Sequence, residues 1–284
     1  MSRGGSTMED EVRSPGGASW SMDAMPYQAL ERERVKDDTL LLYIVASASF
    51  VEITSDVYTR NLADLFHGDA DVVDWLELAW ESEELQHGRA LKRYVEIAWP
   101  DFDWDGAYIN FLGEFMRFCS VDQLAPTRAL EMAARCVVET GTATFYRALA
   151  EMSPEPVLRS LAAAISADEV RHYKHFYHFF LRYREREQPS RAAVARTLWA
   201  RISEVDAEDA FYAFKHVYLS RNPDAKFHED DYTAFRGQLR PLAVRHFPHR
   251  MASKMLLKPL GLSAPVGRLV VPAITSASRL LFLI

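Results

Sequence analysis

The sequence has few of the residues that build cross-links and turns. Cys119 and Cys136 are its only cysteines, which excludes both a disulfide framework and a metal module held by four cysteines. Only 12 glycines and 13 prolines occur among 284 residues, of which 49% are hydrophobic. No stretch of useful length alternates between apolar and polar residues, so a β-rich fold is excluded and we predict an all-α chain.

An excess of positive charge is also lacking. The formal net charge is -7, which argues against general nucleic-acid binding, and no nucleic-acid partner is expected. Residues 1–24 are rich in Gly and Ser and lack the apolar run of a signal peptide. We therefore expect a disordered N-terminal tail and a cytoplasmic protein.

What the sequence does contain is a long stretch, residues 157–188, without Gly or Pro, in which Glu169 and His172 form a Glu-x-x-His motif. Three positions along an α-helix are nearly one turn, so the carboxylate and the imidazole project from one face and can share a metal ion. A second Glu-x-x-His occurs at Glu84 and His87.

Two further glutamates complete a repeated pattern. Glu52 precedes Glu84 by 32 residues, Glu139 precedes Glu169 by 30, and both lie in apolar, helix-forming stretches. The repeat predicts two helix pairs related by a pseudo-twofold axis. We expect six side chains to converge on one dinuclear metal site: Glu52, Glu84, His87, Glu139, Glu169 and His172. Because burial and repulsion would raise the pKa values of four confined carboxylates, metal should stabilise the fold.

One Glu from each of two helices and Glu-x-x-His from each of two others resembles the ligand set of ferritin-like di-iron or di-manganese carboxylate proteins. Within that group the chain is most similar to the soluble acyl-carrier-protein desaturases. Residues 80–88 (WESEELQHG) resemble their first motif and residues 167–172 (ADEVRH) their second. The likeness covers roughly residues 40–185. It implies a ferritin-like four-helix bundle with additional C-terminal helices, holding two Fe ions, with Mn as the alternative metal.

The resemblance also implies roles for two neighbouring residues. Asp168 matches an acidic residue that supports a ligand histidine, and Thr142 matches a hydroxyl beside the oxygen-binding face. The alternatives are a solvated Asp and a Thr bonded to its own helix backbone. His175 and His178 continue the three-residue spacing, but the drift of the helix favours surface or core imidazoles over further ligands. Neighbouring acids such as Glu81 and Glu83 are expected to matter less than the six ligands.

We divide the chain into a tail (1–24), a helix bundle (25–188) and a C-terminal helical extension (189–284). The expected bundle helices span 27–66, 71–98, 126–152 and a segment capped by Ser153 that ends near 184–188, with a shorter helix at 106–120. Further helices are expected at 190–203, 206–220 and 231–246. The tail 259–284 is apolar but broken by Pro265 and Pro272, and it is too interrupted to span a membrane.

Residues 232–284 carry eight Lys or Arg and no Asp or Glu. This asymmetry indicates a docking face for an acidic partner, either an acyl carrier protein or an electron donor such as a ferredoxin. A rival interpretation is peripheral membrane contact through the basic, apolar C-terminal tail. In a third, the basic residues pair with acids of the bundle surface. The resemblance further implies a homodimer.

The resemblance implies an O2-dependent non-haem di-iron oxidase or oxygenase that desaturates or hydroxylates an acyl chain or a similar apolar substrate. Two alternatives stay open: a di-iron N-oxygenase of an amine, and a non-catalytic iron-handling ferritin-like protein. A rubrerythrin-like peroxidase lacks its four-cysteine iron module. A ribonucleotide-reductase radical subunit would carry a Tyr shortly after the first motif, where Leu91 stands four residues beyond His87.

Overall fold

The computed structural model of this chain describes residues 20–117, 124–204 and 209–281. Within these ranges every regular element is helical and no strand occurs. The prediction of an all-α chain is therefore confirmed for the part that the structure describes. Of the predicted tail, residues 1–19 lie outside the described residues, whereas Met22–Ala24 form a 3₁₀ turn.

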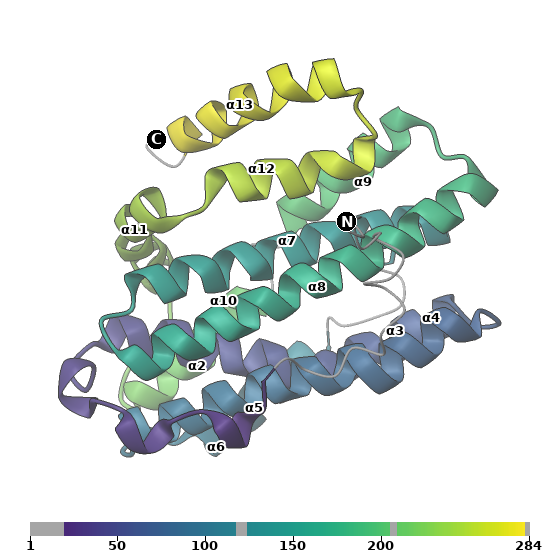
Figure 1. The fold of residues 1–284 in the computed structure, drawn as a ribbon. Helices are drawn as coiled ribbons and strands as arrows, with labels where there is room; N and C mark the ends of the chain where they lie inside the picture. Colours follow the sequence, from purple (N-terminus) through teal and green to yellow (C-terminus); the bar gives the residue numbers. More distant parts are fainter. Residues whose placement is uncertain (1–19, 118–123, 205–208, 282–284) are drawn as a thin grey trace, which may run out of the picture.

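Four helices form two pairs at the centre of the molecule. Helix α2 (Thr39–Ile53) packs against α5 (Glu81–Ala98), and α7 (Arg128–Met152) packs against α8 (Pro156–Glu187). The two pairs lie one above the other in Figure 1, and they meet where α5 contacts α8. These are the two pairs predicted from the repeated spacing of the glutamates.

The expected continuous helix over residues 27–66 is wrong at its start. Residues before Asp38 form short 3₁₀ turns at Tyr27–Ala29 and Arg32–Arg34. The α-helix begins only at Thr39, because the Asp38 carboxylate accepts a hydrogen bond from the Leu41 backbone N–H at 2.9 Å. A side-chain cap of this kind satisfies one of the unpaired N–H groups of the first turn and fixes where the helix starts.

The same predicted helix is also interrupted at Thr54, which separates α2 from α3 (Ser55–Leu65). The Thr54 hydroxyl bonds back to the Val51 carbonyl at 2.7 Å, and such back-bonding competes with regular helical hydrogen bonds. The interruption comes two residues after Glu52, so Glu52 lies in the last turn of α2.

The helix predicted over 71–98 has three parts. Helix α4 (Ala70–Trp75) leads into a π-helical turn, η4 (Leu76–Trp80), and then into α5. Single π turns inside α-helices are frequent near functional sites. This turn ends four residues before Glu84.

The N-cap predicted for α8 was wrong. Glu155, rather than Ser153, accepts from the backbone N–H of Leu158, at 2.8 Å, and Pro156 occupies the first turn. Ser153 instead ends α7. Proline is tolerated in the first turn because the N–H that it lacks has no helical partner there.

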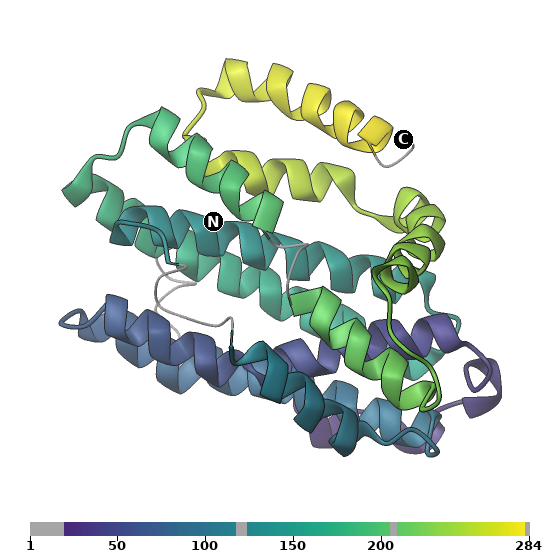
Figure 2. The ribbon, with the colours of Figure 1, turned by 180° about the vertical axis from the view of Figure 1, so that it is seen from behind.

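The remaining helices cover the two pairs. Helix α10 (Asp209–Arg221) packs against α2 and against α6 (Trp104–Phe115), whereas α9 (Arg191–Glu204) and α12 (His249–Leu257) pack on α7. Helix α11 (Glu229–His246) precedes α12, and α13 (Ala264–Leu281) packs on α12 at the edge of the molecule (Figure 2).

The predicted breaks at Pro265 and Pro272 are wrong, because α13 contains both. Pro265 lies in the first turn, where proline is tolerated. Pro272 lies inside the helix with its side chain exposed, so the carbonyl group that loses its helical partner can bond to water.

Two apolar clusters form the core and lie on either side of a polar region. One includes Phe50, Tyr94, Phe111 and Phe214, and the other includes Phe66, Trp80, Phe176 and Phe180. Trp80, the last residue of η4, belongs to one cluster and Leu91 of α5 to the other, with Glu84 and His87 between them in the chain. The polar region is therefore enclosed by apolar surroundings, where charge interactions are weakly screened.

Among the described helices, the stretch Thr39–Leu65 alone is long and apolar enough to cross a membrane by length and composition, and 61% of its most apolar window is buried inside the protein.

Candidate metal centre

The structure brings the six predicted ligand residues together from four helices: Glu52 on α2, Glu84 and His87 on α5, Glu139 on α7, and Glu169 and His172 on α8. Each is at most 6% exposed. Their ligand atoms form two groups, each with all atoms within 4.8 Å of one another: Glu52, Glu84, His87 and Glu169; and Glu84, Glu139, Glu169 and His172. Glu84 and Glu169 belong to both groups.

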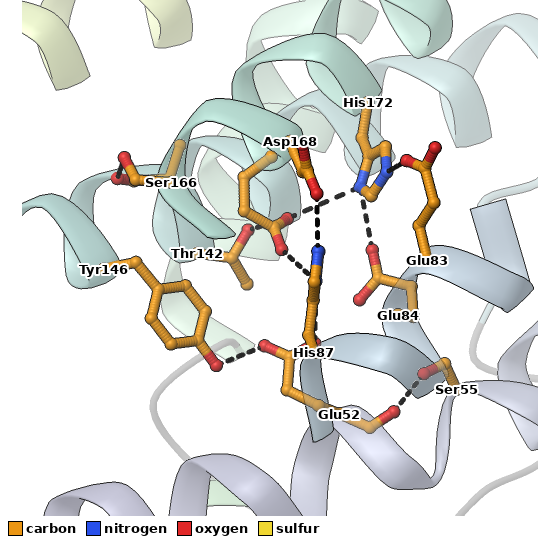
Figure 3. A network of polar contacts seen from close by, with 12 residues as sticks. Glu52, Ser55, Glu83, Glu84, His87, Thr142, Tyr146, Ser166, Asp168 and His172 are labelled. Atoms are coloured by element: carbon orange, nitrogen blue, oxygen red, sulfur yellow. Dashed lines mark hydrogen bonds and ion pairs between the residues drawn. The ribbon is translucent and has the colours of Figure 1, made fainter. Parts of the chain in front are cut away.

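The two histidines lie at corresponding places in these groups. His87 Nδ1 is 3.1 Å from Glu169 Oε1 and 3.8 Å from Glu52 Oε2. His172 Nδ1 is 2.9 Å from Glu84 Oε1 and 3.6 Å from Glu139 Oε2. Figure 3 shows the labelled carboxylates and imidazoles pointing toward one another across the space between the helix pairs.

The hydrogen bonding of these atoms tests whether they suit a metal. Five atoms of the cluster are among the buried side-chain atoms that make no hydrogen bond of acceptable geometry: Glu84 Oε1, His87 Nδ1, Glu139 Oε2, Glu169 Oε1 and His172 Nδ1. Buried polar atoms are nearly always partnered, and here five of the six ligand residues each contribute one such atom. Four carboxylates and two imidazole nitrogens are a donor set suited to iron or manganese. The residues therefore fit a metal ion, and the two groups that share Glu84 and Glu169 fit a pair.

Burial and neighbouring charges shift the pKa values of the cluster's glutamates and histidines. Burial, together with the carboxylates of Glu169 and Glu52, raises the pKa of Glu84 well above its usual range. Burial raises the pKa of Glu139 to about 7. Burial alone would lower the pKa of both histidines, but the carboxylates around them outweigh it, and both pKa values are raised. Without a metal, the cluster therefore holds protons in place of other cations.

A second carboxylate holds the outer nitrogen of each histidine. His87 Nε2 lies 3.1 Å from Asp168 Oδ2, and His172 Nε2 lies 2.7 Å from Glu83 Oε2. Arg171 joins the two arms, because it donates to Asp168 at 2.8 Å and to Glu83 at 2.7 Å. Such contacts direct the inner nitrogen Nδ1 toward a metal and fix the tautomer.

Asp168 therefore contacts a histidine, as the resemblance implied, although that histidine is on the opposite helix pair. Glu83, which the sequence placed outside the six ligands, is buried and contacts His172 as Asp168 contacts His87. A signal was available in the sequence: each residue immediately precedes the Glu of its own motif.

Two hydroxyl groups contact the ligand carboxylates directly. Thr142 Oγ1 donates to Glu169 Oε2 at 2.7 Å, whereas its own-helix carbonyls lie farther away, at 3.3 Å. The buried hydroxyl of Tyr146, which the sequence did not single out, donates to Glu52 Oε1 at 2.5 Å. In each case the hydroxyl group holds one oxygen of the carboxylate, which limits the rotation of that carboxylate.

Trp20 covers the site from outside the four helices. Its indole Nε1 donates to Asp168 Oδ2 at 2.9 Å, its ring stacks on His87 with centroids 6.1 Å apart, and its carbonyl accepts from Gln86 at 3.3 Å. The sequence alone does not distinguish packing from an incidental position for this residue. The contacts show that it packs against the cluster and shields it from water.

Gly88 explains why a glycine follows the histidine of the first motif. A Cβ atom at this position would lie 2.7 Å from the backbone nitrogen of Ile53, the residue after Glu52. Helices α2 and α5 therefore approach each other closely only because position 88 has no side chain. This close approach brings Glu52 within reach of His87.

His175 and His178 belong to neither group of ligand atoms. The ring of His175 stacks on Trp75 with centroids 4.9 Å apart, and burial, with His172 nearby, lowers the pKa of His175 to about 4. His178 is exposed. The structure thus agrees with core and surface positions for these imidazoles.

Comparison of the chain with protein-family models, curated proteins and solved structures gives no match. The class of site therefore rests on its own geometry: an all-α protein with a buried cluster of acidic and histidine side chains that could bind metal.

Proposed function

We propose that this protein is an O2-dependent oxidoreductase with a ferritin-like four-helix bundle that holds two iron ions. The observation that carries the proposal is the pair of overlapping ligand groups, in which Glu84 and Glu169 are shared and Glu52, His87, Glu139 and His172 complete the ends. Oxygen-rich sets of this kind, with a Glu-x-x-His from each of two helices, are typical of di-iron carboxylate proteins.

Bound iron would supply the redox chemistry needed to reduce O2, and the protein residues prepare the site for it. Asp168 and Glu83 hold the protons on the outer nitrogens of His87 and His172, which keeps both Nδ1 atoms free to bind metal. Thr142 can donate or accept a proton at Oγ1, beside Glu169. Trp20 and the two apolar clusters exclude water.

A groove between the end of α2, α3, α5 and α6 could hold a substrate with an apolar chain. It has a volume of about 530 Å³ and is lined by the apolar Ile53, Val57, Leu85, Leu112 and Met116, by Tyr108, and by the charged Asp56, Arg60, Glu81 and Arg89. Ile53 and Leu85 are the next residues after Glu52 and Glu84, so the groove lies beside the ligand-bearing turns. Desaturation of an alkyl chain there would remove two hydrogens. Reduction of O2 to two waters would use these two hydrogens, two electrons from an external donor such as a ferredoxin, and two protons from the solvent.

The test begins with anaerobic iron loading of the full chain, followed by reduction and exposure to O2 with and without long-chain acyl substrates on an acyl carrier protein. We expect two irons per chain and O2 consumption that rises with substrate and yields an unsaturated or hydroxylated product. Glu84→Ala serves as the metal-free control. Substrate-independent O2 consumption with many irons per chain would instead show iron storage, and oxidation of an amine substrate would show an N-oxygenase.

A further inference from the structure

Helix α13 buries a polar side chain and exposes several aliphatic ones. Of its side chains from Ala264 to Arg279, only Thr275 is buried. Thr275 Oγ1 lies 3.1 Å from Ser253 Oγ of α12, and Ser278 Oγ lies 2.9 Å from His249 Nδ1. The contact that holds α13 to the protein therefore includes two polar pairs, with Val270 and Val271 half-buried on the same helix.

Four aliphatic side chains of α13 face away from this contact, whereas Val270 and Val271 are half-buried. Val266, Leu269, Ala273 and Ala277 follow one another at intervals of three and four residues, which places them on one face of the helix. All four are exposed, Leu269 at 76% and Val266 at 44%. Both views show α13 at the outer edge of the molecule, beyond α12 (Figures 1 and 2). An exposed aliphatic stripe of this kind on a surface helix marks a candidate interaction site.

Basic residues accompany this apolar face. Arg268 and Arg279 are exposed on α13, and Arg250 and Lys254 are exposed on α12. Lys258 is exposed at the start of the 3₁₀ turn η6 (Lys258–Leu260), with its ammonium 4.5 Å from the Tyr177 ring centroid. Within the part of the chain that the structure describes, none of these five forms an ion pair with a carboxylate. Pairing with acids of the bundle surface therefore does not explain them.

We propose that α13 docks on a membrane surface that contains anionic lipid, with its aliphatic face in the interface and the basic residues of α12 and α13 near the headgroups. Charge complementarity favours this occupant, since the stretch 232–284 has no acidic residue. A second copy docking through the same face would bring the basic residues of both copies together. Helix α13 also does not qualify as a membrane-crossing helix, so it lies on the surface rather than across the bilayer. The proposal does not depend on the metal chemistry.

The test is co-sedimentation of the full chain with vesicles of phosphatidylcholine alone and of phosphatidylcholine mixed with phosphatidylglycerol. We expect binding to the anionic vesicles only, weakened by added salt. Leu269→Gln should lower the partition coefficient about tenfold, because an exposed aliphatic side chain no longer enters the interface. Leu78→Gln is the matched control, since Leu78 is 77% exposed on a distant helix, and it should bind normally.

Reversal of the charge at basic positions is the second part of the test. Lys254→Glu with Arg268→Glu should lower binding at least tenfold, whereas Arg117→Glu, at an exposed position after α6, should have little effect. The proposal is overturned if the intact chain does not bind anionic vesicles at low salt, or if Leu269→Gln binds like Leu78→Gln. It is also overturned if Leu269→Gln abolishes self-association of a protein that binds no vesicles, or if an acidic carrier protein binds this face and vesicles do not.

Discussion

Glu84 and Glu169 differ from the other members of the cluster because each belongs to both groups of ligand atoms. Glu52 and Glu139 each belong to one group, as do the two histidines. The consequence of losing a carboxylate should therefore depend on its position in the cluster more than on its chemistry.

Glu84→Ala should abolish binding of both ions, whereas Glu139→Ala should leave the group around His87 intact and retain one. Elemental analysis after dialysis against metal-free buffer measures the difference. Both variants should still fold without metal, since each substitution removes one of several buried acids that lie close together. Glu81→Ala, on the same helix but outside both groups, is the control and should keep two ions. Retention of two ions by Glu84→Ala would falsify the shared-ligand assignment.

The contact of Glu83 with His172 leads to a second prediction. Glu83→Ala removes the acceptor that orients the imidazole, and loss of such a partner typically lowers metal affinity about 10–100-fold. Titration against a competing chelator measures the affinity. Glu83→Gln keeps an acceptor oxygen and should lose less. An affinity for Glu83→Ala equal to that of Glu81→Ala would mean that Glu83 does not position the ligand.

At the scale of the helices, the cluster depends on how closely α2 and α5 pack. Gly88 permits the approach, and the interruption at Thr54 directs the chain away after Glu52. In the other pair, the Ser166 hydroxyl of α8 donates to the backbone carbonyl of Ala143 in α7 at 2.8 Å. In each pair, a contact with the backbone of the neighbouring helix lies close to the ligand residues.

Gly88→Ala should force the two helices apart and lower the free energy of unfolding by about 1–3 kcal/mol, the usual cost of overpacking a core. Metal binding should weaken with it, because Glu52 moves away from His87. Gly113→Ala in α6 is the matched control: nothing lies within 4 Å of the added Cβ, and an exposed helical Ala should raise stability by about 0.5–1 kcal/mol. Chemical denaturation of both variants measures the effects, and equal stabilities would contradict the packing argument.

For the molecule as a whole, metal binding and folding should be coupled, because the sites form only when four helices meet. The ion-free cluster retains protons near neutral pH, since the pKa values of Glu84 and both histidines are raised and that of Glu139 is about 7. A metal must displace these protons, so its affinity falls as the pH falls.

The predicted result is a metal-dependent rise in melting temperature that grows from about pH 6 to about pH 8. A free metal concentration of 100 times the dissociation constant raises the free energy of unfolding by about 2.7 kcal/mol. Differential scanning calorimetry with and without Mn²⁺ measures the rise, which avoids oxidation of iron. Glu84→Ala should show none. A rise of the same size at every pH would show that no proton is displaced.

The sequence by itself determined the all-α class and proposed the six residues of the cluster. Both follow from local periodicity: the three-residue step within each motif places Glu and His on one helix face whatever the rest of the chain does. The repeated distances from Glu52 to Glu84 and from Glu139 to Glu169 further indicated two similar helix pairs.

Only the tertiary structure decided what surrounds that cluster. Trp20 reaches Asp168 across 148 positions, Tyr146 reaches Glu52 across 94, and Glu83 reaches His172 across 89. No local pattern encodes such contacts, because they depend on how helices far apart in the chain pack together. The outward aliphatic face of α13 could not be predicted for the same reason: the sequence indicated an interrupted apolar tail, and only packing against Ser253 and His249 decides which side of the helix faces the protein.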